Sequence, residues 1–230
     1  MTDGTKQVAA ETFSDVIEVY GINAAPFFPH FVPAFIHYLR PDVDSHPALK
    51  QLCAYGLSLL ATYGKNSFEP FLEGSVNVLL QGATRTDAKT AELAAATDNM
   101  IVAIGSVALY HNRPDLWQTW LYLLPLTADK SEGQKTYSQL CDLVENNEPG
   151  LLGSDSANLP KITSVLLKVV RQGEEEWLGN DPELAVFLRR RIYHLLKQMQ
   201  HLPQDLFAAL NVNEAAELID LLARQNDDDD

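Results

Sequence analysis

Apolar residues recur at intervals of three and four along most of the chain, which is the spacing of one face of an α-helix. The pattern is clearest in residues 116–147, where two helical stripes are separated by a reversal at Pro125. The stripes consist of Leu116, Trp120, Leu123 and Leu124, and of Tyr137, Leu140, Cys141 and Val144. Proline disfavours helix at the residue before it, so Pro125 is expected to end the first helix. Neither stripe is satisfied by the other alone, so this hairpin requires neighbouring helices.

The same reasoning predicts helices over most of the remaining sequence, and no convincing period-two run indicates a strand. The expected ranges are Thr5–Tyr20, Pro26–Leu39, Pro47–Tyr63, Phe68–Gln81, Asp87–Tyr110, Leu159–Arg171 and Asp181–Met199, with short helices near Pro203–Leu210 and Glu214–Ala223. Asp44 or Ser45 is expected to cap the helix that begins at Pro47. Gly56, inside the buried face of that helix, indicates a close approach of a neighbouring helix. The predicted fold class is all-α.

The helices are spaced as a repeat. Gly21 and Gly64 end comparable helices 43 residues apart, and helix-pair units of about 40–47 residues are typical of HEAT and armadillo arrays. A charged pair also recurs with the same internal spacing, in the residues Asp44 and Lys50, and Asp129 and Lys135. We predict an α–α superhelix, or solenoid, of about five HEAT-like hairpins over residues 1–226, with these four residues in an inter-repeat ladder. Ordinary surface charge on unrelated helices is the alternative interpretation of the pairs.

The charge of the chain narrows the class of partner. The net charge is −14 and the isoelectric point is about 4.7. Four of the negative charges form the terminal run Asp227–Asp230, which is predicted to be an acidic disordered tail. Nucleic acid and anionic membranes are disfavoured as partners because their phosphates require lysine and arginine. A basic protein partner is favoured, although acidic surface residues also commonly serve only to keep a protein soluble.

No pattern in the sequence indicates catalysis, a metal or a cofactor. Cys53 and Cys141 lie among apolar helical neighbours, which indicates two buried thiols in a reducing compartment. Two histidine pairs share a helical spacing without a third ligand, namely His30 with His37 and His194 with His201. Phosphate loops, GxSxG and HExxH are absent. The N-terminus has no signal-peptide core, and the most apolar stretch, Ile101–Tyr110, is shorter than the ~20 residues that a bilayer requires. We therefore expect a soluble, intracellular protein.

Six ordered segments carry a resemblance to a known family. They are Phe13–Val19, Ala54–Gly64, Ala96–Gly105, Trp120–Leu126, Leu140–Asn146 and Asn158–Ile162. In this order and spacing the chain resembles the C-terminal HEAT repeats of the importin-β (karyopherin-β) family of nuclear transport receptors, over roughly Val8 to Leu222. Within the family it is most similar to the importin five branch, whose members carry basic cargoes. The resemblance implies a protein-binding role in nuclear import, with residence in cytoplasm and nucleus.

The chain departs from the family pattern in its length. Family members are much longer, and their N-terminal repeats, which hold the Ran GTPase, have no counterpart in this sequence. The chain begins with what resembles the second helix of a repeat, so it is expected to be a fragment, a partial gene product or a degenerate paralogue. A Ran-dependent transport cycle is therefore not assigned to these residues.

In a HEAT array the second helix of each hairpin lines the concave side, and its polar face is the candidate partner-binding surface. The candidate residues are Asp15, Glu18, Asp98, Asn99, Asp142, Glu145 and Asn146. Acidic and amide groups in register could accept charge-assisted bonds from lysine or arginine. A solvated polar face is the alternative, and Asp98 and Asn99 could instead hold the inter-repeat ladder. A scaffold or self-associating module without a transport role is the second function considered. The cluster Arg189–Arg191 faces three directions, so a carboxylate on a neighbouring repeat is expected to pair with it.

Overall fold

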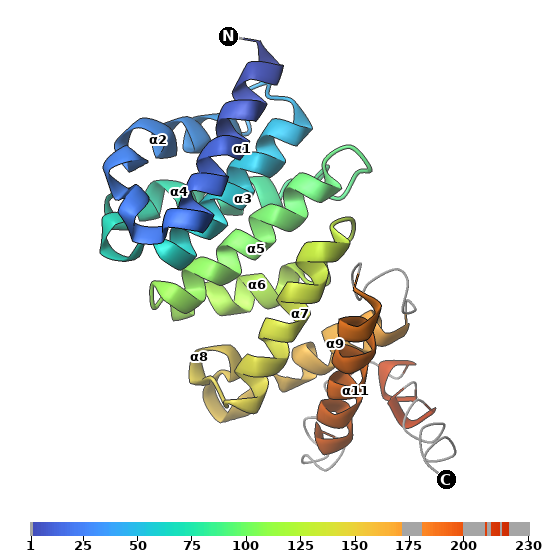
Figure 1. Ribbon diagram of the computed structural model, residues 1–230. Helices are drawn as coiled ribbons and strands as arrows, with labels where there is room; N and C mark the ends of the chain where they lie inside the picture. The colour runs from blue at the N-terminus through green and yellow to red at the C-terminus, as the bar shows by residue number, and fades with distance from the viewer. Residues whose placement is uncertain (1, 172–180, 200–209, 211–212, 217, 221–230) are drawn as a thin grey trace. The chain divides into compact units, whose positions relative to one another are not determined.

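The protein is represented by a computed structural model that describes residues 2–171, 181–199, 210, 213–216 and 218–220. Within these ranges every regular element is a helix (Figure 1). The predicted all-α, helical-repeat fold is confirmed. The chain divides into two compact units, Met1–Asp129 and Lys130–Asp230. The predicted extent of a single array, residues 1–226, stays a prediction, and the predicted tail, 227–230, lies outside the described residues.

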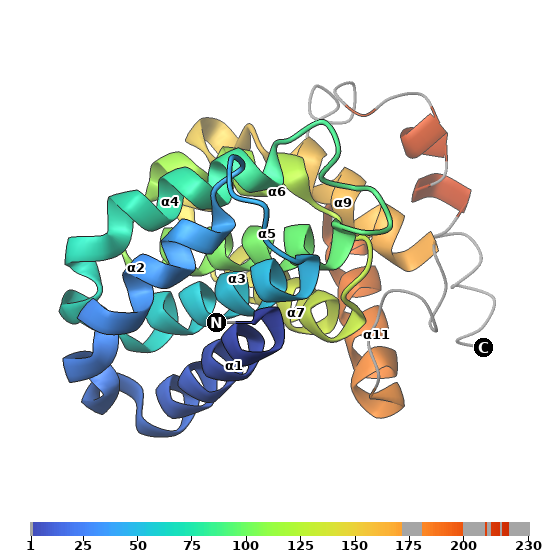
Figure 2. The same ribbon diagram turned by 90° about the horizontal axis from the view of Figure 1, so that it is seen from above.

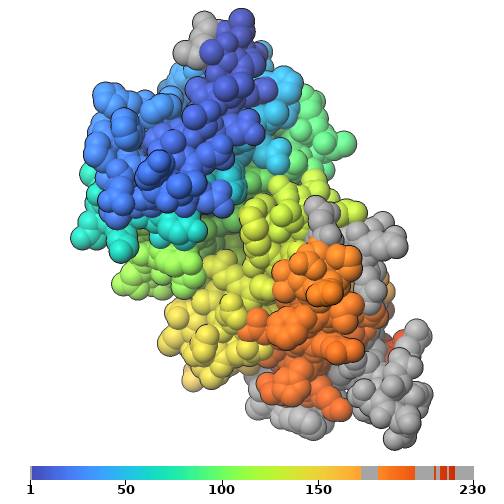
Figure 3. Space-filling model, viewed as in Figure 1, coloured from blue at the N-terminus to red at the C-terminus, as the bar shows by residue number. Residues whose placement is uncertain are grey.

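The first unit consists of two rows of helices. Its elements are α1 (Asp3–Tyr20), η1 (Gly21–Phe27), α2 (Phe28–Leu39), α3 (Pro47–Tyr63), η2 (Lys65–Ser67), α4 (Glu69–Ala83), α5 (Ala94–Tyr110), η3 (Pro114–Leu116) and α6 (Trp117–Leu123). In one row α1 packs on α3, and α3 packs on α5 (Figure 2). In the other row α2 and α4 pack together and cover α3 and α5. The space-filling view shows α1 and α2, in blue, as one continuous surface of this unit (Figure 3).

Close contacts between small and large residues join the two rows. Gly56 of α3 lies so close to the ring of Phe35 on α2 that a Cβ atom at this position would overlap it. At the end of α3, Gly64 faces Phe28 at the beginning of α2, so the two helices are antiparallel. The prediction that Gly56 marks a close helix contact is therefore confirmed. Such packing buries both apolar stripes of a hairpin and supplies the main stabilisation of the unit.

Two local predictions were wrong. Helix α5 begins at Ala94 and not at Asp87, because residues before it form turns. There Arg85 binds Asp87 through two bonds of 2.7 and 2.6 Å, and Thr97 donates to the carbonyl of Ala88 at 2.7 Å. These side-chain bonds compete with helical backbone bonding. Helix α3 is capped by His46, whose Nδ1 accepts the N–H of Ala48 at 3.2 Å, and not by Asp44 or Ser45.

The second unit contains α7 (Lys130–Glu145), α8 (Pro149–Leu152), η4 (Ser154–Ser156), α9 (Leu159–Arg171) and α11 (Pro182–Met199). Helix α11 packs against both α7 and α9. Residues 213–216 and 218–220 are also helical, which overlaps the range predicted for the last helix, Glu214–Ala223. The helix predicted near Pro203–Leu210 lies outside the described residues except for Leu210.

Candidate partner-binding surface

Helix α1 carries a stripe of exposed carboxylates. Asp15 and Glu18, both predicted site residues, lie on its solvent face together with Glu11. The spacing i, i+4, i+7 places all three on one side of the helix. The hydroxyl of Tyr55 on α3 donates to Glu18 Oε2 at 3.3 Å, so the Glu18 end of the stripe lies beside the neighbouring helix of the row. Glu11 was not among the predicted residues, although its spacing from Asp15 signalled it.

Asp98 and Asn99 are buried, so the prediction that they lie on an accessible partner-binding face is wrong. Only 1 % of Asp98 and 2 % of Asn99 is exposed. The Asp98 carboxylate accepts the backbone N–H groups of Thr127 at 2.9 Å, Ala128 at 2.6 Å and Asp129 at 2.9 Å. Burial raises the pKa of Asp98, and the three N–H bonds partly offset that rise. Asp98 therefore holds the loop that follows α6 against α5.

Asp129 links α3 and α5. Its Oδ2 atom accepts from Gln51 Nε2 at 3.3 Å and from Asn99 Nδ2 at 2.9 Å. Bonds from two neighbouring helices of the row thus meet at one carboxylate, as expected of an inter-repeat ladder. The side-chain amides of Gln51 and Asn99 are donors to this carboxylate, and its predicted pairing with Lys135 stays a prediction. A hydrogen bond from a neutral side-chain amide between packed helices is less sensitive to salt than an exposed ion pair.

The remaining predicted ladder residues have other surroundings. Lys135 pairs with Glu132, one turn earlier on the same helix, at 2.7 Å. Lys50 is buried, and burial followed by the nearby charge of Arg85 lowers its pKa. The carboxylates of Asp44 and Asp87 act in the opposite direction on that pKa. Lys50 therefore lies within electrostatic reach of Arg85 and of the carboxylates Asp44 and Asp87.

The acidic residues predicted on α7 are engaged by α11. Arg191 donates to Glu145 through Nε at 2.8 Å and Nη2 at 2.5 Å, and Nη2 also donates to Asp142 at 2.5 Å. The expectation that the arginine cluster pairs with carboxylates of a neighbouring helix is confirmed for Arg191. Because Arg191 binds both carboxylates, Asp142 and Glu145 are less available to a basic partner than the carboxylates of α1. Asn146 is exposed and stays a candidate.

This ion pair predicts how stability depends on pH. The bond from Arg191 lowers the pKa of Glu145 below its ordinary value of 4.5. The stabilisation is therefore present above the ordinary value and is lost as the pH falls through the lowered one. We expect Glu145→Gln to reduce the free energy of unfolding by about 0.5–1 kcal/mol at pH 7, because the pair is partly exposed. Urea unfolding should show a smaller difference at pH 3 than at pH 7.

The control for this experiment is Glu11→Gln, which removes an exposed carboxylate for which no bond is described. It should have the stability of the wild type at both pH values. An equal loss at pH 7 and pH 3 in Glu145→Gln would contradict the role assigned to the charge of Glu145.

Metal-ion binding, membrane spanning and thiol reactivity were each assessed from the described residues. Among the described residues no group of three or more histidine, cysteine or acidic side chains is arranged to hold a metal ion. None of the helices in the described part of the chain is long and apolar enough to cross a membrane. Burial raises the pKa of Cys53 and of Cys141 to about 12, so both thiols are protonated near neutral pH. Both are buried as predicted.

Comparison with known proteins shows similarity to importins. No protein-family model matches the chain. Over 141 residues, or 57% of the chain, it is 30% identical to a probable importin-5 homolog of Dictyostelium discoideum. Over 147 residues, or 61% of the chain, it is 24% identical to importin subunit beta-3 of Saccharomyces cerevisiae. The chain is related to the importin-β family.

The matches to these importins cover 13% of the length of each relative. The predicted resemblance to the importin-β family is confirmed over about 60% of this chain. In this importin-β relative, the row α1–α3–α5 presents the exposed carboxylates of Glu11, Asp15 and Glu18 beside Tyr55. The other predicted acidic residues are occupied by internal bonds.

Proposed function

We propose that this importin-β-related chain is a non-catalytic, protein-binding segment of a nuclear transport receptor, and that its α1–α3 face receives a basic segment of cargo. The carboxylate stripe Glu11, Asp15 and Glu18 is the observation that carries the proposal. The names of the relatives, importin-5 homolog and importin subunit beta-3, support a transport role. The chain has 31 acidic and 17 basic residues, and this excess of negative charge supports a basic partner. Nucleic acid, membranes and cofactors have no part in this proposal.

The spacing of the stripe suits an extended peptide. Residues three and four apart on a helix are about 4.5–6 Å apart along its axis. Alternate side chains of an extended chain are separated by about 6.6 Å. Lysine or arginine side chains at every second position of a peptide can therefore reach successive carboxylates on α1, where charge-assisted bonds form. Residence in cytoplasm and nucleus follows from this role, and a Ran site is expected in other repeats of a full receptor.

The test is binding of a fluorescent peptide with alternating lysine and serine residues, measured by anisotropy. Asp15→Asn with Glu18→Gln should weaken binding about threefold to tenfold, because two exposed charge contacts are lost. The matched control, Glu73→Gln with Glu183→Gln, changes the net charge equally at two exposed carboxylates on α4 and α11. It should bind like the wild type. If both double variants bound the peptide equally weakly, the loss of affinity would be an effect of net charge alone. That result would contradict the proposed face.

Self-association is the second candidate function, and exposed apolar residues on α1 favour it. Val8 is 62% exposed, and Val19 is 76% exposed. A second copy that covers this helix would bury both side chains and would compete with the peptide. Sedimentation velocity distinguishes the two functions, because self-association requires a dimer fraction that rises with protein concentration and falls in Val19→Ser.

A further inference from the structure

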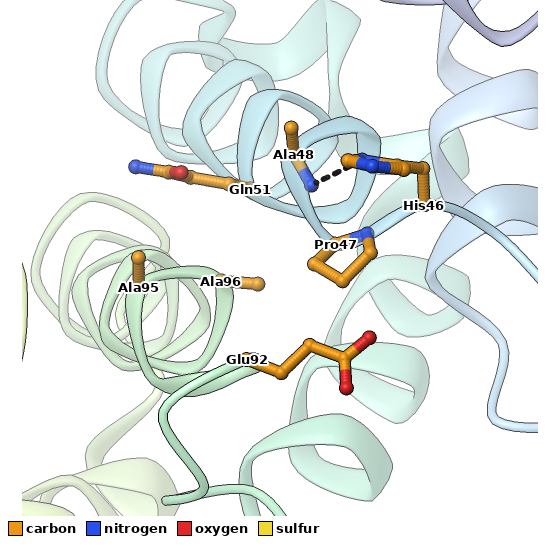
Figure 4. A pocket seen from close by; sticks show the side chains of 7 residues that line it. All are labelled: His46, Pro47, Ala48, Gln51, Glu92, Ala95 and Ala96. Atoms are coloured by element: carbon orange, nitrogen blue, oxygen red, sulfur yellow. Dashed lines mark hydrogen bonds between the residues drawn. The ribbon is translucent and has the colours of Figure 1, made fainter.

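A hollow of about 390 Å³ lies between the first turns of α3 and α5 (Figure 4). Its walls are apolar, with Pro47 and Ala48 on the side of α3 and Ala95 and Ala96 on the side of α5. The volume lies at the small end of the range of ligand pockets, which is about 300–1,000 Å³. A space of this size and lining accommodates one long side chain with an aliphatic stem.

The charged group of the hollow is a carboxylate without a partner. Glu92 extends its side chain below Pro47, so that its carboxylate lies at one end of the hollow (Figure 4). Glu92 is exposed, and no hydrogen bond or ion pair joins its side chain to another described residue. At the other side lies Gln51, whose amide nitrogen donates to Asp129 at 3.3 Å. The carbonyl oxygen of Gln51 is then the part of the amide that can accept a bond.

An anion is a poor occupant, although the hollow borders a helix N-terminus. The N–H of Ala48 already donates to His46 Nδ1, and the N–H groups of Leu49 and Lys50 donate to the His46 carbonyl at 2.9 and 3.1 Å. The first turn of α3 therefore offers no free backbone donor to a phosphate or carboxylate. Because Nδ1 accepts the N–H of Ala48, the His46 ring caps this turn and occupies its foremost donor.

We propose that this hollow is a subsite for a lysine or arginine side chain of the bound basic segment. The aliphatic stem lies along the proline and alanine walls, and the cationic end binds the Glu92 carboxylate. This assignment rests on the proposed function, because it adds a specificity pocket to the same surface. Lysine and arginine commonly bury their stems in this way while the charged end stays near water.

The hollow and the carboxylate stripe lie on the same side of the row. Gln51 and Tyr55 are one turn apart on α3, which is about 6 Å, and Tyr55 contacts Glu18 at 3.3 Å. Near the other end of α1, Gln7 Nε2 lies 3.4 Å from His46 Nδ1. A peptide of a few extended residues therefore spans from the hollow to the stripe.

The test uses the full chain and the alternating lysine and serine peptide. Ala95→Phe fills the hollow, and Glu92→Gln removes its charge. We expect each substitution to weaken peptide binding about threefold to tenfold. The double variant should bind the peptide with the same affinity as Ala95→Phe alone, because both changes act on one bound side chain. The matched controls are Ala91→Phe, an exposed alanine outside the hollow, and Glu73→Gln. Both should bind like the wild type.

A second measurement avoids dependence on the folding of a variant. The same peptide with photo-reactive lysine analogues is irradiated with the wild-type chain, and the adducts are located by mass spectrometry. Adducts in residues 46–51 or 92–96 support the subsite, and adducts confined to other segments overturn it. Normal binding by Ala95→Phe together with weak binding by Asp15→Asn with Glu18→Gln would reject the hollow but retain the proposed function. Failure of the peptide to bind the wild type would reject both.

Discussion

Replacing Gly105 by alanine is expected to lower the free energy of unfolding by about 2–3 kcal/mol, as is typical when a methyl group is forced into a packed core. An added Cβ would lie 2.5 Å from Nε1 and 2.8 Å from Cε2 of Trp120. The indole is fully buried and rigid, so it cannot move aside without disturbing the contact between α5 and α6. Urea unfolding followed by circular dichroism measures the loss.

Two other glycines serve as matched controls. A Cβ at Gly82 would meet the sulfur of Met100, a flexible side chain that can adopt another rotamer, so Gly82→Ala should cost less. A Cβ at Gly4 has no atom within 4 Å, and alanine there should be neutral or slightly stabilising. If Gly105→Ala proved as stable as Gly4→Ala, the close packing of α6 on α5 would be contradicted.

Replacing Asp98 by alanine is the second large expected effect, with a loss of about 3 kcal/mol in the free energy of unfolding. The carboxylate accepts three backbone N–H groups from the loop 127–129, at distances between 2.6 and 3.0 Å. Removing it leaves these donors without their acceptor and releases the loop that positions Asp129. The linkage from Asp129 to Gln51 and Asn99 should weaken as a consequence. Urea unfolding and amide exchange of residues 127–129 together measure the effect.

Asp98→Asn is the informative companion, because it retains one acceptor oxygen but brings an NH₂ group toward the backbone donors. Its stability should lie between that of the wild type and that of Asp98→Ala. Asp15→Ala removes an exposed aspartate and should change stability by no more than ~0.5 kcal/mol. Equal stability of Asp98→Ala and Asp15→Ala would show that the loop does not depend on this carboxylate.

The helices were predictable because their signal is local. Apolar spacing placed Trp120, Tyr137 and Leu140 correctly in the core, where all three are completely buried. The close approach at Gly56 was also predictable, because a glycine inside a buried stripe leaves room for a neighbouring helix to come near. The beginning of α5 was predicted too early because the bonds that keep residues 85–93 out of the helix involve Arg85 and Thr97, whose partners the helical pattern does not show.

The candidate site was harder to predict because its residues differ only in their tertiary partners. Asp15 and Asp98 are both aspartates on the helices of one row, yet one is exposed and the other accepts bonds from a loop some 30 residues later. In the same way, Glu145 became unavailable through Arg191, 46 residues further along the chain. Spacing along a helix indicates a face, but it does not show which chain segment covers that face. The unpartnered Glu92 had no signal in the sequence, because it lies in a turn.

The proposed α1–α3 face is tested most directly by hydrogen exchange of the full chain with and without the lysine-containing peptide. We predict slower exchange in α1 and in the first turns of α3 and α5, and unchanged exchange in α2 and α4. The protection should disappear in Asp15→Asn with Glu18→Gln and persist in Glu73→Gln with Glu183→Gln. Protection confined to α2 and α4, or equal in the two double variants, would contradict the central claim that this carboxylate-bearing row of helices receives basic protein segments.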